Sequence, residues 1–202
     1  MIELALAFTS FWTPLPPEPP EVRTPTVAWK VDLGAPSFGG AAIADADGDG
    51  GLDVAFGTYF GDSKVRVLRG KTGELIWEHD FGVACLDASC RFVDLDADAR
   101  PELVIPVSNA SRVLAFEGAT GTLRWSRDLD VGECIDTPPW IGTIDGQLRI
   151  AVGTFKGNVH FISAADGSLV RTLKVAPGAV QSCPIVMDVN ADGTPDVIAG
   201  NF

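Results

Sequence analysis

Histidine and positive charge are scarce in this sequence. Only two histidines occur among 202 residues, and 15 lysines and arginines stand against 27 aspartates and glutamates, giving a net charge of −12. This acidic balance argues against a nucleic-acid partner, because phosphates are bound by lysine and arginine. No apolar run approaches the roughly 20 residues that a membrane-spanning helix requires. Neither His79 nor His160 has a recognisable serine or cysteine partner for nucleophilic catalysis, and both are predicted to be exposed strand residues.

The first 26 residues do not look like part of the fold. Residues 4–8 form a short apolar run, but no lysine or arginine precedes it. A secretory signal needs a positive start and a longer apolar core. Residues 14–20 contain five prolines and are expected to form an extended linker. We therefore predict an N-terminal arm over residues 1–26, comprising a degraded signal and a linker, and a folded domain over residues 27–202.

A repeat of about 48 residues organises the rest of the chain. Trp29, Trp77 and Trp125 are spaced 48 residues apart, and Arg171 follows in the same place 46 residues later. The pattern Gly-x-Leu-x directly precedes Trp77, Trp125 and Arg171. Its glycine supplies the positive φ of a tight hairpin turn. Each repeat contains four short β-rich segments, and no segment has the periodicity of an amphipathic helix.

Four strands in a repeat of this length are typical of a β-propeller blade. The predicted fold is all-β, with blades at about 41–81, 89–129 and 137–175, a half blade at 182–202 and a lone tryptophan strand at 27–33. Propellers close into rings, so about three and a half blades of a longer propeller are expected. The alternative is a four-bladed ring closed by residues 27–33. In a partial propeller, exposed blade edges favour self-association.

Short acidic loops recur at one point of the repeat. Carboxylates at loop positions 1, 3, 5 and 9 point inward when the chain curls around an ion, and position 7 offers its backbone carbonyl. Ca²⁺ takes about six to eight such oxygens. An EF-hand is excluded, because its position 12 falls on Phe56 in an expected strand. The predicted ligands are Asp45, Asp47, Asp49, Gly51 and Asp53 in the first loop, Asp94, Asp96, Asp98, Arg100 and Glu102 in the second, and Asp188, Asn190, Asp192, Thr194 and Asp196 in the third.

Three loops in register favour calcium over ordinary aspartate-rich turns, so up to three Ca²⁺ sites are expected. No histidine or cysteine lies in any loop, which disfavours transition metals. The ion would hold mutually repelling carboxylates together in a structural role. The second loop is predicted to be the weakest site, since Ala99 replaces the glycine of the turn and Glu102 is longer than aspartate. In the third repeat the corresponding segment, residues 141–146, is degenerate.

The cysteines fall in the segments that link one blade to the next. Their clustering at one mouth of the central channel suggests disulfides between adjacent blades, with buried free thiols as the alternative. A zinc site lacks the paired Cys-x-x-Cys spacing. The candidate disulfide residues are Cys85, Cys90, Cys134 and Cys183. Asp87 and Asp136, which occupy equivalent places in neighbouring repeats, are expected to line the same face.

Two family resemblances follow from these motifs. The acidic loops, with Phe38-Gly39-Gly40-Ala41 before the first loop and Asp-Val after it, resemble the FG-GAP/VCBS-type repeats of integrin-α-like propellers. The Gly-x-Leu-x-Trp segments resemble the blade motif of quinoprotein (PQQ)-like propellers. Together they cover residues 27–202 and imply calcium-bearing propeller blades. They do not select a function, because such blades serve adhesion, scaffolding and enzymes alike.

The main functional hypothesis is a non-enzymatic binding or scaffold module with structural calcium. Its ligand would be a protein or a carbohydrate, and its location extracytoplasmic, whether secreted, periplasmic or at the cell surface. The alternative is part of a propeller enzyme, either a quinoprotein-like dehydrogenase or a calcium-dependent carbohydrate-active enzyme. Asp87 and Asp136 could then be paired catalytic carboxylates. Their equivalence in the repeat favours a structural origin, so no catalytic or cofactor-binding residue is assigned.

Overall fold

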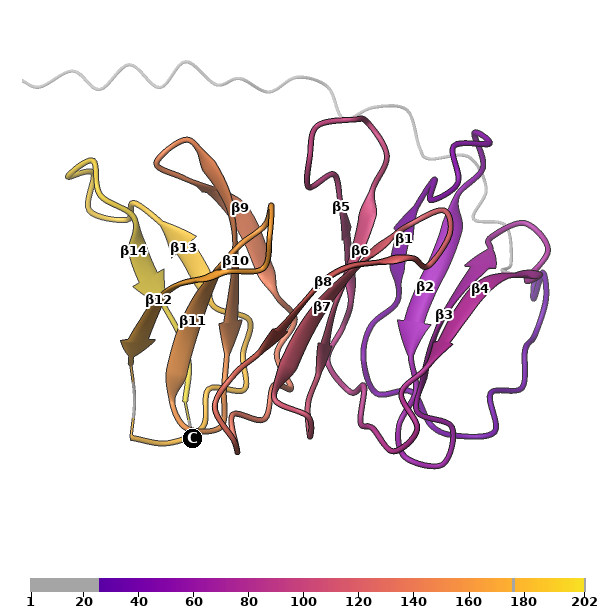
Figure 1. The fold of residues 1–202 in the computed structure, drawn as a ribbon, viewed down its shortest axis with the longest axis horizontal. Helices are drawn as coiled ribbons and strands as arrows, with labels where there is room; N and C mark the ends of the chain where they lie inside the picture. Colours follow the sequence, from indigo (N-terminus) through magenta and orange to yellow (C-terminus); the bar gives the residue numbers. More distant parts are fainter. Residues whose placement is uncertain (1–25, 176, 202) are drawn as a thin grey trace, which may run out of the picture.

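Fourteen β-strands make up the described part of the protein, residues 26–175 and 177–201 of a computed structural model (Figure 1). They form three four-stranded antiparallel sheets and one two-stranded sheet, in which each strand pairs with its neighbour in the sequence. These sheets are the predicted blades, and they follow one another side by side.

The first blade contains β1 (Ala42–Ala44), β2 (Asp53–Gly57), β3 (Lys64–Arg69) and β4 (Leu75–Asp80). The second contains β5 (Arg91–Val93), β6 (Glu102–Val107), β7 (Arg112–Glu117) and β8 (Leu123–Asp128). The third contains β9 (Trp140–Ile144), β10 (Gln147–Gly153), β11 (Asn158–Ser163) and β12 (Leu169–Lys174), and the half blade contains β13 (Ile185–Met187) and β14 (Asp196–Ile198).

The antiparallel order places the loops of the blades at two opposite faces. Acidic loops join the first strand of a blade to the second, and glycine turns join the third strand to the fourth. Both therefore lie at one end, here called the acidic-loop face (residues 45–52, 70–74, 94–101, 118–122 and 188–195). The hairpins 58–63 and 108–111 and the inter-blade segments 81–90 and 129–139 lie at the other end, the linker face. Because β1 contacts β5 and β9 contacts β13, the first strands line the centre.

The core consists of apolar layers between successive blades. Side chains alternate between the two faces of a strand, so Leu103 packs toward the first blade and Val104 toward the third. All six residues of β6 are buried for this reason. Phe161 and Val186 form the smaller layer between the third blade and the half blade. Apolar burial between successive sheets is the main force holding the blades in series.

The Gly-x-Leu-x-Trp motif couples each blade to the next one. Trp77 of the first blade donates a hydrogen bond from Nε1 to the carbonyl of Gly118 in the second blade, at 2.6 Å. Trp125 donates in the same way to Ala164 of the third blade, at 2.9 Å. The indole of Trp77 lies against Gly121, where an added Cβ would be 2.6 Å from a ring carbon. The glycine of one motif thus provides both a turn, at φ 69°, and the seat for the preceding tryptophan.

The prediction of a strand at residues 27–33 was wrong, because within the described residues this segment pairs with no other strand. Trp29 nevertheless takes the place of a blade tryptophan, since its Nε1 donates to the carbonyl of Gly70 at 2.8 Å. The half blade leaves Ile185 and Ile198 almost half exposed, and association through blade edges stays a prediction. Nearly all of the predicted N-terminal arm lies outside the described residues. Within those residues, no helix is long and apolar enough to cross a membrane.

Candidate metal centres

The three acidic loops share one hydrogen-bonded scaffold. In each loop the carboxylate at position 1 accepts a hydrogen bond from the backbone N–H at position 6. Asp45 accepts from Gly50 at 2.9 Å, and Asp94 accepts from Ala99 at 2.9 Å. Asp188 accepts from Gly193 at 2.8 Å in the same manner. These bonds curl each loop back on its first residue.

The acid at position 9 closes each loop from the first residue of the following strand. Asp53 accepts a hydrogen bond from the Ala46 N–H at 3.0 Å, and Glu102 accepts one from the Leu95 N–H at 2.8 Å. Asp53 is only 2% exposed and Glu102 only 1%. Burial raises the pKa of both carboxyls above their ordinary values, and neighbouring loop carboxylates add to the rise. A cation at this point would offset the cost of keeping them ionised.

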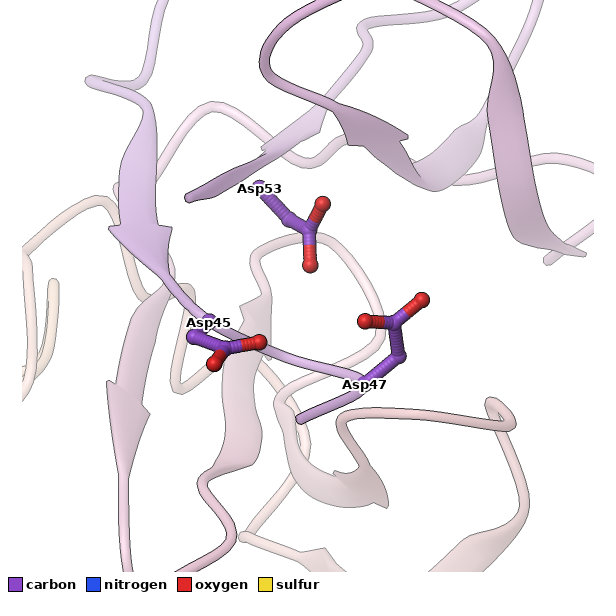
Figure 2. A group of neighbouring side chains, drawn as sticks. All are labelled: Asp45, Asp47 and Asp53. Atoms are coloured by element: carbon purple, nitrogen blue, oxygen red, sulfur yellow. The ribbon is translucent and has the colours of Figure 1, made fainter. Parts of the chain in front are cut away.

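Carboxylates converge in the first two loops. Asp45, Asp47 and Asp53 each offer an oxygen within 4.8 Å of the other two, and Figure 2 shows the three side chains turned toward a common space. Three carboxylates of the second loop meet the same limit, namely Asp94, Asp96 and Glu102. These acidic groups could hold a metal ion, and an oxygen-only donor set matches hard cations such as Ca²⁺.

Other predicted ligands lie apart from these clusters. Asp49 pairs with Arg69, whose Nη1 lies 2.6 Å from the carboxylate, and Asp98 accepts a hydrogen bond from the Arg100 N–H at 2.8 Å. The third loop, within the described residues, does not bring three of its carboxylates within 4.8 Å of one another. Its closing acid, Asp196, is half-buried, because the half blade has no third strand to cover it.

Two arginines that the loop pattern did not predict bind the clusters. Arg69 contacts Asp47 at 2.9 Å from the end of β3. Arg124 on β8 contacts Asp96 at 2.8 Å and Glu102 at 2.9 Å. Each arginine is at least 20 residues from the loop residues that it contacts, so only the folded sheet reveals the pair. The excess of acidic residues in the loops was the one available signal in the sequence.

The third blade confirms the predicted degeneration of its loop. A two-residue turn at Asp145 and Gly146, with φ of 51° and 72°, replaces the nine-residue loop. Arg149 pairs with Gly142 on the neighbouring strand, and Asp53 pairs with Ala44 at the equivalent place in the first blade. The blade without an acidic loop therefore carries a cationic side chain where the others carry their closing carboxylate.

A second group of polar side chains lies at the linker face. Asp136 accepts a hydrogen bond from the Ser108 hydroxyl and lies near Asp87. Burial raises the pKa of Asp136, and the charge of Asp87 raises it further. One oxygen of Asp87, Oδ1, is buried without a hydrogen-bond partner in the described structure. Cys85 lies beside Asp87, and burial together with that carboxylate raises the pKa of the thiol to about 12.

All four cysteines are free thiols in this structure, and the disulfides between blades stay a prediction. Cys85 and Cys90 are buried, and Cys90 belongs to the core layer between the first and second blades instead of the channel mouth. Burial raises its pKa to about 11, so it is an unreactive core residue. Cys134 and Cys183 are half-buried.

The predicted exposure of both histidines was wrong. His79 is half-buried between Phe81 and Phe116, with ring centroids 4.6 Å and 5.1 Å away. His160 is 4% exposed, and its Nε2 lies 3.6 Å from the carboxylate of Glu133, which is itself 1% exposed. Burial lowers the pKa of His160, so the ring is neutral at physiological pH. Glu133 was missed because nothing in its local sequence distinguishes it from a surface acid.

Sheets of four antiparallel strands, joined in series by tryptophans and packed face to face, define the blades of a β-propeller. Residues 45–105, which contain the first two acidic loops, match the family model of the FG-GAP-like repeat. The predicted propeller fold and the predicted FG-GAP-type repeat are thereby confirmed. The chain carries about three and a half blades of such a propeller.

Comparison with named proteins adds a group of relatives. The chain is similar to the outer membrane protein assembly factor BamB of Kangiella koreensis, with 25% identity over 179 residues that cover 86% of this chain and 42% of that protein. The crystal structure of BamB from Moraxella catarrhalis has a TM-score of 0.59 at 20% identity, over 80% of this chain and 44% of that one. A quinohemoprotein alcohol dehydrogenase from Comamonas testosteroni has a TM-score of 0.52 at 17% identity, over 73% and 22%. The likeness to these two solved structures shows a shared fold alone. The chain spans less than half the length of the curated relatives that it matches.

Proposed function

We propose that this chain is a calcium-stabilised propeller module that binds a protein partner outside the cytosol. The calcium role rests on three loops with one scaffold, two of which gather three carboxylates within 4.8 Å. Asp45, Asp47 and Asp53 would hold the ion in the first loop, and Asp94, Asp96 and Glu102 in the second. In the third loop Asp188, Asn190, Asp192 and Asp196 supply the same types of oxygen. The ion would fix the turn between the first two strands of a blade.

The scaffold role is supported by the relatives. Those with curated names are called outer membrane protein assembly factors, and that name describes a protein that acts on other proteins outside the cytosol. Likeness to a quinohemoprotein alcohol dehydrogenase, by contrast, is one of fold alone. A binding module at an extracytoplasmic site is therefore favoured over the enzyme alternative.

The linker face is the proposed binding surface. The observation that carries this assignment is the pair Asp87 and Asp136, two carboxylates from neighbouring inter-blade segments with no cationic side chain bound to either within the described residues. The Oδ1 atom of Asp87 is buried and has no hydrogen-bond partner in the described structure, so it would gain one if a bound cation reached it. Val83 and Val131, which are 81% and 92% exposed, lie in the same two segments. A lysine or arginine flanked by apolar side chains complements this combination of charge and apolar surface.

Binding of a defined peptide pair tests this surface. A fluorescein-labelled peptide with one arginine between leucines is compared with the same peptide carrying glutamate in place of arginine. The wild-type chain is expected to bind the arginine peptide more tightly, and the double substitution D87N/D136N should weaken binding by about 10- to 100-fold, since charge-assisted hydrogen bonds are lost. Removing two like charges should leave the melting temperature unchanged or higher, which circular dichroism checks.

The matched control is D80N/D130N, which removes two exposed acids from the same side of the molecule. This variant should bind the arginine peptide nearly as well as the wild type. Equal weakening by both double substitutions would mean that the peptide responds to overall charge and not to the Asp87–Asp136 pair. Equal binding of both peptides by the wild-type chain would remove this surface as a cation-binding site.

A further inference from the structure

We infer that Arg69 and Arg124 are built-in counter-ions of the first two acidic loops and that they set how tightly these loops bind calcium. This inference rests on the proposed calcium role. Arg69 forms a two-pronged contact, with Nη2 2.9 Å from Asp47 and Nη1 2.6 Å from Asp49. Asp47 is one of the three converging carboxylates of the first loop. The guanidinium therefore occupies an oxygen that a bound ion would require.

Arg124 engages more of the converging carboxylates in the second loop than Arg69 does in the first. Arg124 contacts Asp96 at 2.8 Å and Glu102 at 2.9 Å, which are two of the three converging carboxylates, and it also lies 3.3 Å from Glu117. Both oxygens of Glu102 are already engaged, one by Arg124 and the other by the Leu95 N–H. The Glu102 side chain is 1% exposed, so its pair with Arg124 is shielded from water far more than the Arg69 pairs are.

These arginines come from different places in the repeat. The position of Arg69, opposite the closing acid of its blade, is taken by Glu117 in the second blade. The position of Arg124 is taken by Ile76 in the first blade. Two loops thus obtain a guanidinium from two unrelated strands, and the third blade has Arg149 in place of the closing acid. What the first two blades share is a positive charge beside the acidic cluster, and not a repeated residue.

Competition follows from this geometry. The carboxylate of Asp47 has one oxygen bound by Arg69 and the other by the Asp49 N–H at 3.2 Å. To coordinate calcium, the loop must release the guanidinium, and the free energy of that release lowers the affinity. The same arginine stabilises the metal-free loop, because it screens carboxylates that would otherwise repel one another. Arginine and calcium are alternative counter-ions, so removing the arginine should make the loop depend on the metal.

Calcium titration of the metal-free chain tests this inference, with calorimetry for affinity and circular dichroism for stability. Relative to the wild type, R69Q is expected to raise the affinity of one site by about ten-fold and to lower the melting temperature in EDTA. R69K keeps the charge but loses the forked contact. Its calcium affinity and its melting temperature in EDTA should therefore lie between those of the wild type and R69Q. R124Q should show the same two changes at a second site, and a larger fall in metal-free stability. R112Q, which removes the exposed Arg112–Asp128 pair away from the loops, is the control and should change neither quantity.

The outcomes separate the two proposals. Calcium binding to the wild type with unchanged affinity in R69Q and R124Q overturns the counter-ion role and leaves the calcium role standing. Calcium binding only after an arginine is removed supports the counter-ion role in its strongest form. Absence of calcium binding in the wild type and in both variants overturns the calcium role, and the counter-ion role with it.

Discussion

Alanines in the acidic loops hold backbone conformations that usually require glycine. Ala97 and Ala99 in the second loop have φ of 64° and 67°, and Ala191 in the third has φ of 61°. The first loop has Gly48 and Gly50 at the corresponding positions. A residue with a Cβ costs about 1–2 kcal/mol in this region. The second loop thus carries two strained residues, the third carries one and the first carries none, which adds a backbone reason to the prediction that the second loop is the weakest site.

Relieving this strain should stabilise the protein. The substitution A99G is expected to raise the free energy of unfolding by about 1 kcal/mol, because the gain in the left-handed region exceeds the entropy cost of the added glycine. Urea denaturation measures this difference. A119G is the matched control, since Ala119 also lies in a turn but has a negative φ, and it should be neutral or destabilising. A loss of stability in A99G equal to that in A119G would contradict the strain argument.

Residues were predictable where a local pattern carries the chemistry. The converging carboxylates of the first two loops and the left-handed residue at position 6 follow from the loop sequence alone. Arg69 and Arg124 could not be predicted, because strand pairing brings them to loops distant in sequence. His160 was misjudged for a related reason. It lies in an alternating strand, but a propeller strand is covered by a blade on each face, so alternation no longer separates buried from exposed residues.

Among the elements, the link between tryptophan and glycine explains what the 48-residue repeat encodes. Each repeat specifies one sheet together with the contact that docks it on the next sheet, and this is why Trp and Gly recur together. The same contact explains the error at residues 27–33. Trp29 has the packing partner of a blade tryptophan, in Gly73, but no neighbouring strand supplies backbone hydrogen bonds. A tryptophan at the right spacing thus predicts docking, and a strand requires a paired neighbour as well.

Substitutions at two glycines separate this docking contact from backbone strain. Gly121 and Gly146 have φ of 69° and 72°, but an added Cβ meets the Trp77 ring at 2.6 Å in the first case and nothing within 4 Å in the second. G146A should cost about 1–2 kcal/mol for the left-handed backbone alone. G121A should cost about 2–5 kcal/mol, because overpacking against the indole is added. Urea denaturation gives both values, and equal losses would show that the tryptophan seat contributes little.

At the scale of the whole molecule, the repeat places all three acidic loops on one face and concentrates negative charge there. Eleven acidic side chains belong to these loops, out of 27 in the chain. The order and type of strands could be predicted because each blade is a local unit. The way charge is balanced across the face could not, since it depends on Arg69 and Arg124 reaching the loops from later strands of their own sheets and on Arg149 replacing an acid.

Calcium should therefore stabilise the molecule in a pH-dependent way. In EDTA, the raised pKa values of Asp53 and Glu102 mean that the folded state holds protons more tightly than the unfolded state. Their contribution to stability is favourable at low pH and is lost as pH rises from the ordinary values of 3.8 and 4.5 through the raised ones. Calcium binds the ionised carboxylates, so it should restore stability at pH 7.5 and have little effect near pH 4.

Thermal melts with and without calcium measure this effect directly. A site at 100 times its dissociation constant contributes about 2.7 kcal/mol, which for a domain of this size raises the melting temperature by about 5–10 °C. Magnesium at the same concentration should do much less, because it demands near-ideal octahedral geometry and gives up its waters reluctantly. Coincident melts in calcium and EDTA at pH 7.5 would mean that arginines and backbone N–H groups already satisfy the loops. The acidic face would then be a set of ordinary turns, and the propeller would depend on its tryptophan contacts and apolar layers alone.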